Sequence, residues 1–161
     1  MDVTLIVDGA NVMGSRADGW WRDRAGAMAR LHGELVALAA RGIRGPVPGD
    51  PAVRGDAVDA ADEPGSADAP ETGADDTDGR WYPEIVLVVE GRTRKVLSLV
   101  SPAPGIRVVA ARGEGDDEIA DLASRLPGQR VVVTADRELR RRSIAAGAGV
   151  AGPGWLIRQL G

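Results

Sequence analysis

Four short runs of valine, isoleucine and leucine limit how this chain can fold. They occupy residues 2–8, 84–91, 106–112 and 130–136, and their apolar residues follow one another without polar residues at alternate positions. Runs of this kind are typical of strands in a parallel sheet covered on both faces, because an exposed face would place a polar residue at every second position. The chain is therefore predicted to contain a central, mostly parallel sheet.

Segments with helical spacing lie between these runs. Apolar residues recur at intervals of three and four over Arg24–Arg41, which predicts a helix with Asp23 as its cap and Gly42 as its end. The remaining predicted elements are helices over 115–126 and 137–148, a short strand near Val150 and a last helical turn over Trp155–Leu160. Residues 14–24 are predicted to form a loop, and residues 92–100 fit either a short helix or extended chain. Strands that alternate with helices predict an α/β fold with three layers, α/β/α.

Composition narrows the class of protein further. The chain has 161 residues, which is typical of one domain, and it has no phenylalanine, so its core is built from aliphatic side chains. The absence of cysteine excludes disulfides and thiolate metal sites. No apolar run approaches the roughly 18 residues of a membrane span, and the start Met1-Asp2 lacks the basic region of a secretory signal. A cytoplasmic location without a membrane partner is expected.

One acidic segment interrupts the predicted domain. Residues 46–79 are rich in proline, glycine, alanine and aspartate and show neither helical nor strand periodicity, so they are predicted to be disordered. Ten acids and one arginine give this segment −9, and the net charge of −4 leaves +5 for the rest of the chain. A basic body is suited to approach a polyanion, which an acidic segment would repel or imitate.

Polar residues gather where the predicted strands end. Asp8 ends the first strand and Asp136 ends the fourth, while Asp116 and Asp117 begin the helix after the third. The carboxyl ends of parallel strands share one edge of the sheet, where open α/β sheets hold their functional sites. Asn11, three residues after Asp8, is expected at the same edge, and Glu90, which ends the second strand, is a further candidate.

Several carboxylates at one edge need a compensating charge. Two like charges 4 Å apart cost roughly 4 kcal/mol even at an effective dielectric constant of about 20. A proton, an arginine or a divalent cation can compensate, and oxygen ligands without histidine or cysteine favour Mg²⁺ or Mn²⁺. Such an ion can activate water for phosphodiester hydrolysis. Asp116 and Asp117 also have a structural interpretation, since an aspartate at the start of a helix can serve as its cap.

Taken in order, these motifs resemble the PIN-like nuclease superfamily. The segments that carry the resemblance are LIVDGANVMG (5–14), VLVVEG (86–91), GEGDDEIADLA (113–123), VVVTADRELRRR (131–142) and GVAGPGWLIRQL (149–160). Within the superfamily they are most similar to the NYN group, close to its bacterial YacP-like branch. The resemblance covers residues 1–44 and 81–161, which is nearly all of the chain outside the acidic segment.

The resemblance implies a three-layer fold and a Mg²⁺- or Mn²⁺-dependent ribonuclease. It places the metal among the residues equivalent to Asp8, Asn11, Asp116 and Asp136, with Asp117 as the alternative to Asp116 in the double-aspartate motif. Some relatives carry aspartate where Glu90 stands, which leaves the role of Glu90 open. RNA is the expected partner, as an mRNA substrate or in association with the ribosome, and the oligomeric state is left open.

Basic and aromatic residues near this edge are candidates for RNA contact. They are Arg16, Arg137, Arg140, Arg141 and Trp20, with Arg22, Arg24, Arg92, Arg94 and Arg142 as extensions of the track. Of the neighbouring Trp20 and Trp21, one is expected to pack against the sheet and the other to stack on a base.

Two other functions use the same residues. One is an RNA-binding or regulatory module without catalysis, and the other is a phosphohydrolase that acts on small nucleotides in a closed pocket. The only histidine, His32, lies in the middle of a predicted helix and is expected at the surface or its boundary, so histidine acid–base chemistry is not predicted.

Overall fold

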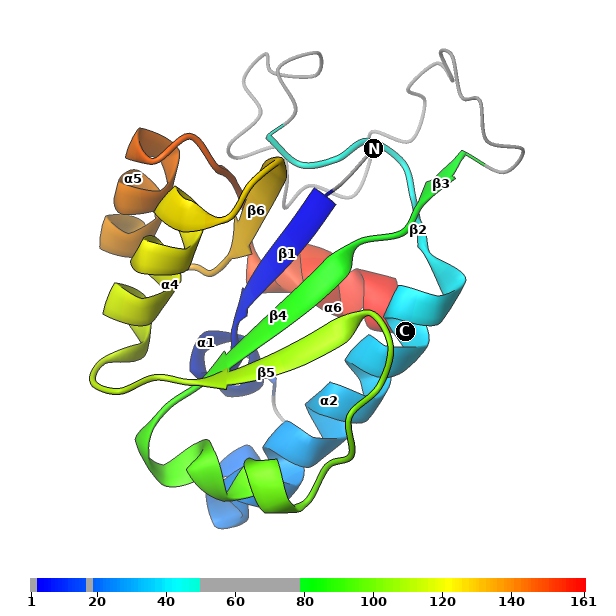
Figure 1. The fold of residues 1–161 in the computed structure, drawn as a ribbon. Coiled ribbons are helices and arrows are strands. Elements are labelled where there is room, and N and C mark those ends of the chain that lie inside the picture. The colour runs from blue at the N-terminus through cyan, green and yellow to red at the C-terminus, as the bar shows by residue number, and fades with distance from the viewer. Residues whose placement is uncertain (1–2, 17–18, 50–78) are drawn as a thin grey trace.

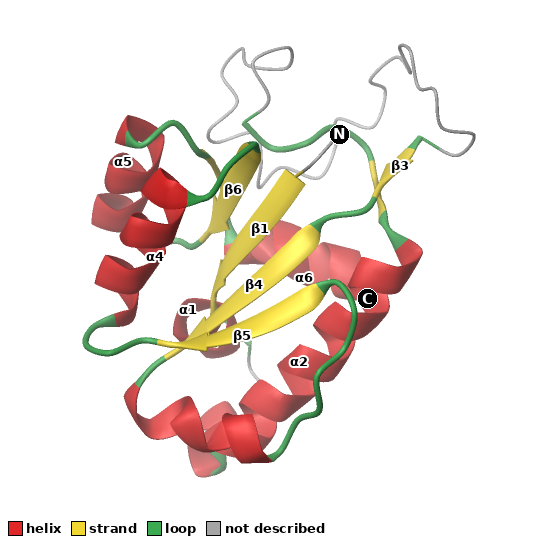
Figure 2. Ribbon diagram, viewed as in Figure 1, coloured by secondary structure: helices red, strands yellow, loops and turns green. Residues whose placement is uncertain are grey.

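A computed structural model describes residues 3–16, 19–49 and 79–161, with the backbone alone for residues 92–94. A five-stranded sheet forms its centre, in the order β5-β4-β1-β6-β7. Every neighbouring pair in this sheet is parallel, and Asp8 in β1 lies opposite Val88 in β4. The strands are β1 (Val3–Asp8), β4 (Glu84–Val89), β5 (Ile106–Ala110), β6 (Gln129–Val133) and β7 (Gly149–Ala151). The predicted parallel sheet is confirmed (Figures 1 and 2).

Helices cover both faces of the sheet, as the three-layer prediction requires. The helical elements are α1 (Gly9–Gly14), η1 (Trp20–Arg22), α2 (Arg24–Arg41), η3 (Gly91–Ser98), α4 (Gly115–Arg125), α5 (Arg137–Ala145) and α6 (Pro153–Leu160). In Figure 1, α4 and α5 lie on one side of the sheet and α2 and α6 on the other. The fold is therefore α/β with three layers.

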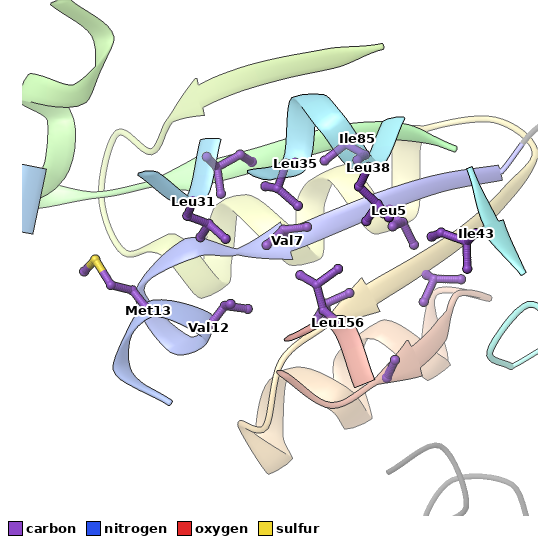
Figure 3. Close-up of a cluster of buried hydrophobic side chains, with 14 of the residues drawn as sticks. Leu5, Val7, Val12, Met13, Leu31, Leu35, Leu38, Ile43, Ile85 and Leu156 are labelled. Atoms are coloured by element: carbon purple, nitrogen blue, oxygen red, sulfur yellow. The ribbon is translucent and has the colours of Figure 1, made fainter. Parts of the chain in front are cut away.

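The core divides into two clusters because successive strand residues point to opposite faces. Leu5 and Val7 of β1 pack with Leu31, Leu35 and Leu156, which come from α2 and α6 (Figure 3). Ile6, between them in the strand, packs on the opposite face in the second cluster, which includes Ile119 and Leu122 of α4 and Leu139 of α5. Leu5, Ile6 and Val7 are buried on both faces of β1, which explains why its apolar residues are continuous in the sequence.

Arg130 joins three segments at the amino end of β6. Its Nε donates to the carbonyl of Ala123 at 2.9 Å, its Nη1 to Gly128 at 2.6 Å and its Nη2 to Ala146 at 2.9 Å. Ala123 lies in the last turn of α4 and Ala146 directly follows α5, so the guanidinium meets carbonyls left open at two helix ends. This side chain therefore holds α4 and α5 to the start of the strand between them.

The structure differs from the sequence predictions in several places. β6 ends at Val133, so Asp136 lies three residues beyond the strand and caps α5 instead. Residues 9–14 form the short helix α1, and η1 lies within the predicted loop. Residues 91–98 form the 3-10 helix η3, which decides between the two interpretations of that segment. A second, two-stranded antiparallel sheet, β2 (Ile43–Arg44) with β3 (Arg80–Trp81), was not predicted.

Two further expectations are corrected. His32 is 7% exposed, not at the surface, because it lies one turn from the buried Met28 and Leu35 on the core side of α2. Burial also lowers the pKa of the His32 imidazole. The acidic segment was predicted to be disordered from residue 46, but Val47 is 4% exposed and belongs to the core. Residues 50–78 of that segment lie outside the described residues. In the described part of the chain, no helix combines the length and apolar character needed to cross a bilayer.

Candidate active site at the carboxyl edge of the sheet

Acidic residues follow three adjacent strands at the centre of the sheet. Asp8 is the last residue of β1, Glu90 directly follows β4 and Asp136 follows β6. Because β1 lies between β4 and β6, these residues converge where the chain crosses from one half of the sheet to the other. This is the position at which open α/β sheets bind ligands. We call Asp8, Asn11, Glu90, Asp116 and Asp136 the carboxylate edge.

Hydrogen bonds tie the β1–α1 turn to the loop after β6. The Asn11 backbone N–H donates to Asp8 Oδ1 at 3.3 Å, and Thr134 Oγ1 donates to Asp8 Oδ2 at 3.0 Å. Asn11 Oδ1 in turn accepts from the Ala135 N–H at 2.9 Å. Thr134 is fully buried and also accepts from the Asp136 N–H at 3.1 Å, so one hydroxyl positions both acids. Thr134 lies in the segment VVVTADRELRRR, but nothing in the sequence indicates its contact with Asp8.

The electrostatic environment of Asp8 is unfavourable for its charge. Burial raises the pKa of the Asp8 carboxyl above its ordinary value of 3.8, and the charges of Glu90 and Asp136 raise it further. The hydrogen bonds from Thr134 and Asn11 act in the opposite direction without cancelling the rise. The protein without metal therefore holds a half-buried carboxyl whose negative form lacks full compensation.

This environment predicts how stability depends on pH. The folded protein keeps the Asp8 proton at pH values where the unfolded chain has released it, so Asp8 lowers the free energy of unfolding as pH rises from about 3.8 through the raised pKa. In urea unfolding with EDTA present, the stability of Asp8→Asn relative to the wild type should increase across this window and then stay constant. A difference between the two proteins that does not vary with pH would contradict the assignment.

Glu90 reaches from β4 to the start of α4. Its Oε2 accepts from the Gly115 N–H at 3.3 Å, and a Cβ added at Gly115 would lie only 2.5 Å from this oxygen. The carboxylate therefore lies against the first residue of α4, next to Asp116. The role of Glu90 was left open by the sequence, and the structure brings it into the carboxylate edge.

The structure separates the two aspartates of the α4 motif. The N-cap of α4 is Glu114, so neither aspartate occupies the cap position. Asp117 is exposed and forms an ion pair with Arg142 of α5, with its Oδ1 3.1 Å from Nη1 of the guanidinium. Asp116 is half-buried, and its carboxylate has no hydrogen-bond or ion-pair partner among the described residues. This difference favours Asp116 over Asp117 as the member of the carboxylate edge.

Gly9 allows α1 to begin directly after Asp8. A Cβ at this position would lie 2.8 Å from the carbonyl oxygen of Val88 and 3.0 Å from Met28 Sδ. Since the Val88 oxygen belongs to a central strand, a Gly9→Ala substitution must displace the turn, and we expect it to cost about 1–3 kcal/mol of unfolding free energy.

Gly33→Ala is the matched control for this prediction. Gly33 lies inside α2 with nothing within 4 Å of an added Cβ, so this change should stabilise the protein by about 0.5–1 kcal/mol. Denaturant unfolding of both variants measures the two effects. A Gly9→Ala protein as stable as the wild type would show that the turn does not depend on this close contact.

The arginines predicted to contact RNA differ in their exposure to solvent and in whether their guanidinium groups already have partners within the protein. Arg16 is paired with Glu34 through two hydrogen bonds at 2.6 and 3.3 Å, and Arg141 pairs with Glu138 on its own helix. Arg140 is half-buried and its Nε donates to the Thr134 carbonyl at 2.8 Å, directly behind the carboxylate edge. Arg137 is exposed and has no partner among the described residues. Arg137 is therefore the one of these four arginines whose guanidinium is not already engaged within the described structure.

The two neighbouring tryptophans occupy different environments. Trp20 is half-buried against the larger core cluster, whereas 55% of Trp21 is exposed. Arg22 and Arg24 lie beside these rings, and the side chains of Arg92 and Arg94 are outside the described atoms. Trp21 rather than Trp20 is thus the aromatic open to a ligand.

The acids at the carboxylate edge are the type of ligand that a hard divalent cation prefers. In this conformation, however, their side chains do not surround a common site. All available donors are oxygens, which suits Mg²⁺ and Mn²⁺. Within residues 3–16, 19–49 and 79–161, no three carboxylate or imidazole groups come close enough together to form a ready metal site. Two surface depressions lie elsewhere, at the amino ends of the strands. One is lined by residues that include Gln129 and Gly149, and the other by residues that include Thr4 and Glu84. Side chains at the carboxylate edge would have to move toward an ion to share it.

A parallel five-stranded sheet between helical layers, with acids after its central strands, defines a three-layer α/β fold. The structure is similar to a crystal structure of a mutant of Rae1 (YacP) from Bacillus subtilis, with a TM-score of 0.60 and 16% sequence identity. The match covers 99% of this chain and 75% of that chain. It agrees in fold with the YacP-like branch that the sequence resembles. No protein-family model and no curated protein match the sequence.

Proposed function

We propose that this protein is a ribonuclease that uses Mg²⁺ or Mn²⁺ to hydrolyse phosphodiester bonds in RNA. The observation that carries the proposal is the half-buried Asp8 carboxyl, located where three central strands end and within reach of the charges of Glu90 and Asp136. A fold gains no stability from placing like charges together, which favours a functional reason for the arrangement. The fold that this chain shares with Rae1 (YacP) supports the same conclusion.

The metal would be held by Asp8, Asp116 and Asp136, directly or through water, with Glu90 beside Asp8. When bound, the ion neutralises phosphate charge and activates a water molecule as the nucleophile. Thr134 and the Asn11 N–H orient the two oxygens of Asp8. Asn11 Oδ1 is already engaged by Ala135, which leaves the Nδ2 donors of Asn11 for a phosphate oxygen.

Binding of the RNA backbone is assigned to α5. Arg137 and Arg140 lie in its first turn and a half, directly after Asp136, so they can contact phosphates next to the scissile bond. Asp117 supports this surface through its ion pair with Arg142, which holds α5 against α4. The substrate would be an mRNA or an RNA in a ribosomal complex.

A cleavage assay tests the proposal. A labelled, unstructured RNA incubated with the protein should be cut in Mn²⁺ or Mg²⁺ and remain intact in EDTA. At a constant concentration of free metal, nucleoside triphosphates in excess should not prevent cleavage, because the depressions at the amino ends of the strands lie away from the carboxylate edge. Failure of both metals to support cleavage, or cleavage that persists in EDTA, would rule out the proposed function.

A second function, RNA binding without cleavage, is favoured by one observation. As they stand, no three carboxylates in the described ranges are close enough to hold an ion. RNA affinity that does not depend on metal, is lost when Arg140–Arg142 are neutralised and is not accompanied by turnover in Mn²⁺ would identify this function.

A further inference from the structure

An exposed aromatic side chain lies one short helix away from the carboxylate edge. Trp21 belongs to η1, which connects α1 to α2, and 55% of its surface is accessible to solvent. A tryptophan with this exposure gains little by packing within its own chain, although its indole is the largest apolar side chain in a protein. The ring contacts of Trp21 in the described structure are with Trp20 and Arg22, which lie outside the carboxylate edge, so the catalytic proposal does not account for it.

The structure holds η1 in place before any ligand binds. Gly19 adopts a φ of 76°, in the left-handed region that favours glycine, and its carbonyl accepts from the Arg22 N–H at 3.0 Å. Trp20 packs against the core and meets the Trp21 ring edge-on, with the centroids 6.0 Å apart and the planes at 88°. Trp21 is therefore a supported platform, and little conformational freedom is lost when a flat ligand settles on it.

Positive charge surrounds this platform. The Arg22 guanidinium lies 5.8 Å from the centre of the Trp21 ring, and that of Arg24 lies 5.2 Å from the centre of the Trp20 ring. The neighbouring acid, Asp23, already accepts from the Gly26 N–H at 3.0 Å as the cap of α2. An exposed indole beside arginines matches a base attached to a phosphate, which is the chemistry of single-stranded nucleic acid.

The platform lies within reach of the proposed cleavage site. A Cβ added at Gly14, the last residue of α1, would be 3.8 Å from Cζ2 of Trp20. Helix α1 begins directly after Asp8 and has six residues, so it spans about 9 Å. In Figure 1, α1 lies where β1 and β4 end, on the same side of the molecule as the amino end of α2. The path from Asp8 along α1 to the tryptophan pair is therefore short enough for one bound RNA strand to contact both.

We propose that Trp21 stacks on an unpaired base of single-stranded RNA bound across the carboxylate edge, with Arg22 contacting the adjacent phosphate. This inference rests on the proposed function, which supplies RNA as the substrate. It adds a binding position for a nucleotide of that RNA away from the cleaved bond. It makes the enzyme selective for single strands, because a base held in a duplex has no free face to offer Trp21.

Binding measured without divalent cations tests this inference. The dissociation constant of a short fluorescent, unstructured RNA in EDTA should rise at least about fivefold in Trp21→Ala and recover in Trp21→Phe, since stacking needs an aromatic face. Tyr82→Ala is the matched control. Tyr82 is also exposed, at 58%, but it lies just before the amino end of β4, whereas the carboxylate edge lies at the carboxyl ends of the strands. The loss of Tyr82 should therefore leave RNA affinity unchanged.

A scan with abasic nucleotides locates the stacked base. One abasic position should weaken binding to the wild type but not to Trp21→Ala, because the variant has already lost the contact. Equal affinity of the wild type and Trp21→Ala, or no RNA binding by the wild type, would overturn the inference. Cleavage in Mn²⁺ is a separate readout: an uncut RNA that still binds through Trp21 would refute the proposed function and support the platform.

Discussion

Replacing Asp8 with asparagine is expected to reduce Mn²⁺-dependent RNA cleavage by at least about 100-fold while the protein stays folded. Asparagine removes the negative charge at the centre of the carboxylate edge. It preserves the size of the side chain, and its oxygen can still accept from the Asn11 N–H. Thr134 can accept from the new amide because a hydroxyl both donates and accepts. The measurement is the single-turnover cleavage rate with saturating protein.

Asp121→Asn is the control for the loss of one carboxylate. Asp121 lies on the exposed side of α4 and pairs with Arg125 at 2.8 Å, away from the carboxylate edge. Its neutralisation should leave the cleavage rate within about twofold of the wild type, because exposed pairs contribute little. An Asp8→Asn protein that cleaves at the wild-type rate would remove Asp8 from the mechanism.

Replacing Arg130 with methionine is expected to lower the free energy of unfolding by about 2–4 kcal/mol. The change removes three hydrogen bonds from a charged donor and leaves the carbonyls of Ala123, Gly128 and Ala146 without it. Methionine retains most of the side-chain volume, so the effect reports the polar contacts rather than a cavity. Urea denaturation followed by circular dichroism measures the loss.

Arg125→Met is the matched comparison, because Arg125 is an exposed arginine on α4 whose side chain pairs only with Asp121 in the described structure. We expect its replacement to change stability by less than about 0.5 kcal/mol. If the two variants were equally stable, Arg130 would not join the ends of α4 and α5 to β6.

The layers of the fold were predictable because their signal is local and repeated. Val86 and Val88 point to one face of β4 and Leu87 to the other, and burial of both faces leaves a continuous apolar run in the sequence. The side of α2 that faces the core was predictable in the same way, from apolar residues spaced three and four apart. His32 falls on the same side of the helix by this spacing. His32 lies four residues after Met28 and three before Leu35, so the expectation of a surface residue gave more weight to polarity than to position.

Other elements depend on contacts between distant parts of the chain. Residues 9–14 begin and end with glycine and have low intrinsic helix propensity, yet they form α1 because Asp8 caps it and Val12 and Met13 are buried. β2 and β3 each have two residues and pair across the acidic segment, so neither shows a period. In both cases tertiary contacts stabilise structure that the local sequence does not specify.

Some features of the candidate site could likewise be predicted from the sequence, whereas others required the structure. Asp8, Asn11 and Asp136 were predicted at this edge from their positions at or after apolar strands, which is information in the sequence. The choice of Asp116 over Asp117 required the ion pair of Asp117 with Arg142, and the part played by Thr134 required the conformation of the loop after β6. Sequence spacing places residues at an edge, whereas their orientation depends on the neighbouring helices.

The most direct test of the central claim is the position of Mn²⁺ in crystals soaked with this ion, located by its anomalous scattering. The account predicts a peak at the carboxyl ends of β1 and β6, about 2.0–2.3 Å from an oxygen of Asp8 and absent from crystals of Asp8→Asn. A wild-type crystal with no anomalous peak among Asp8, Asp116 and Asp136, at a concentration of Mn²⁺ that supports RNA cleavage, would contradict it.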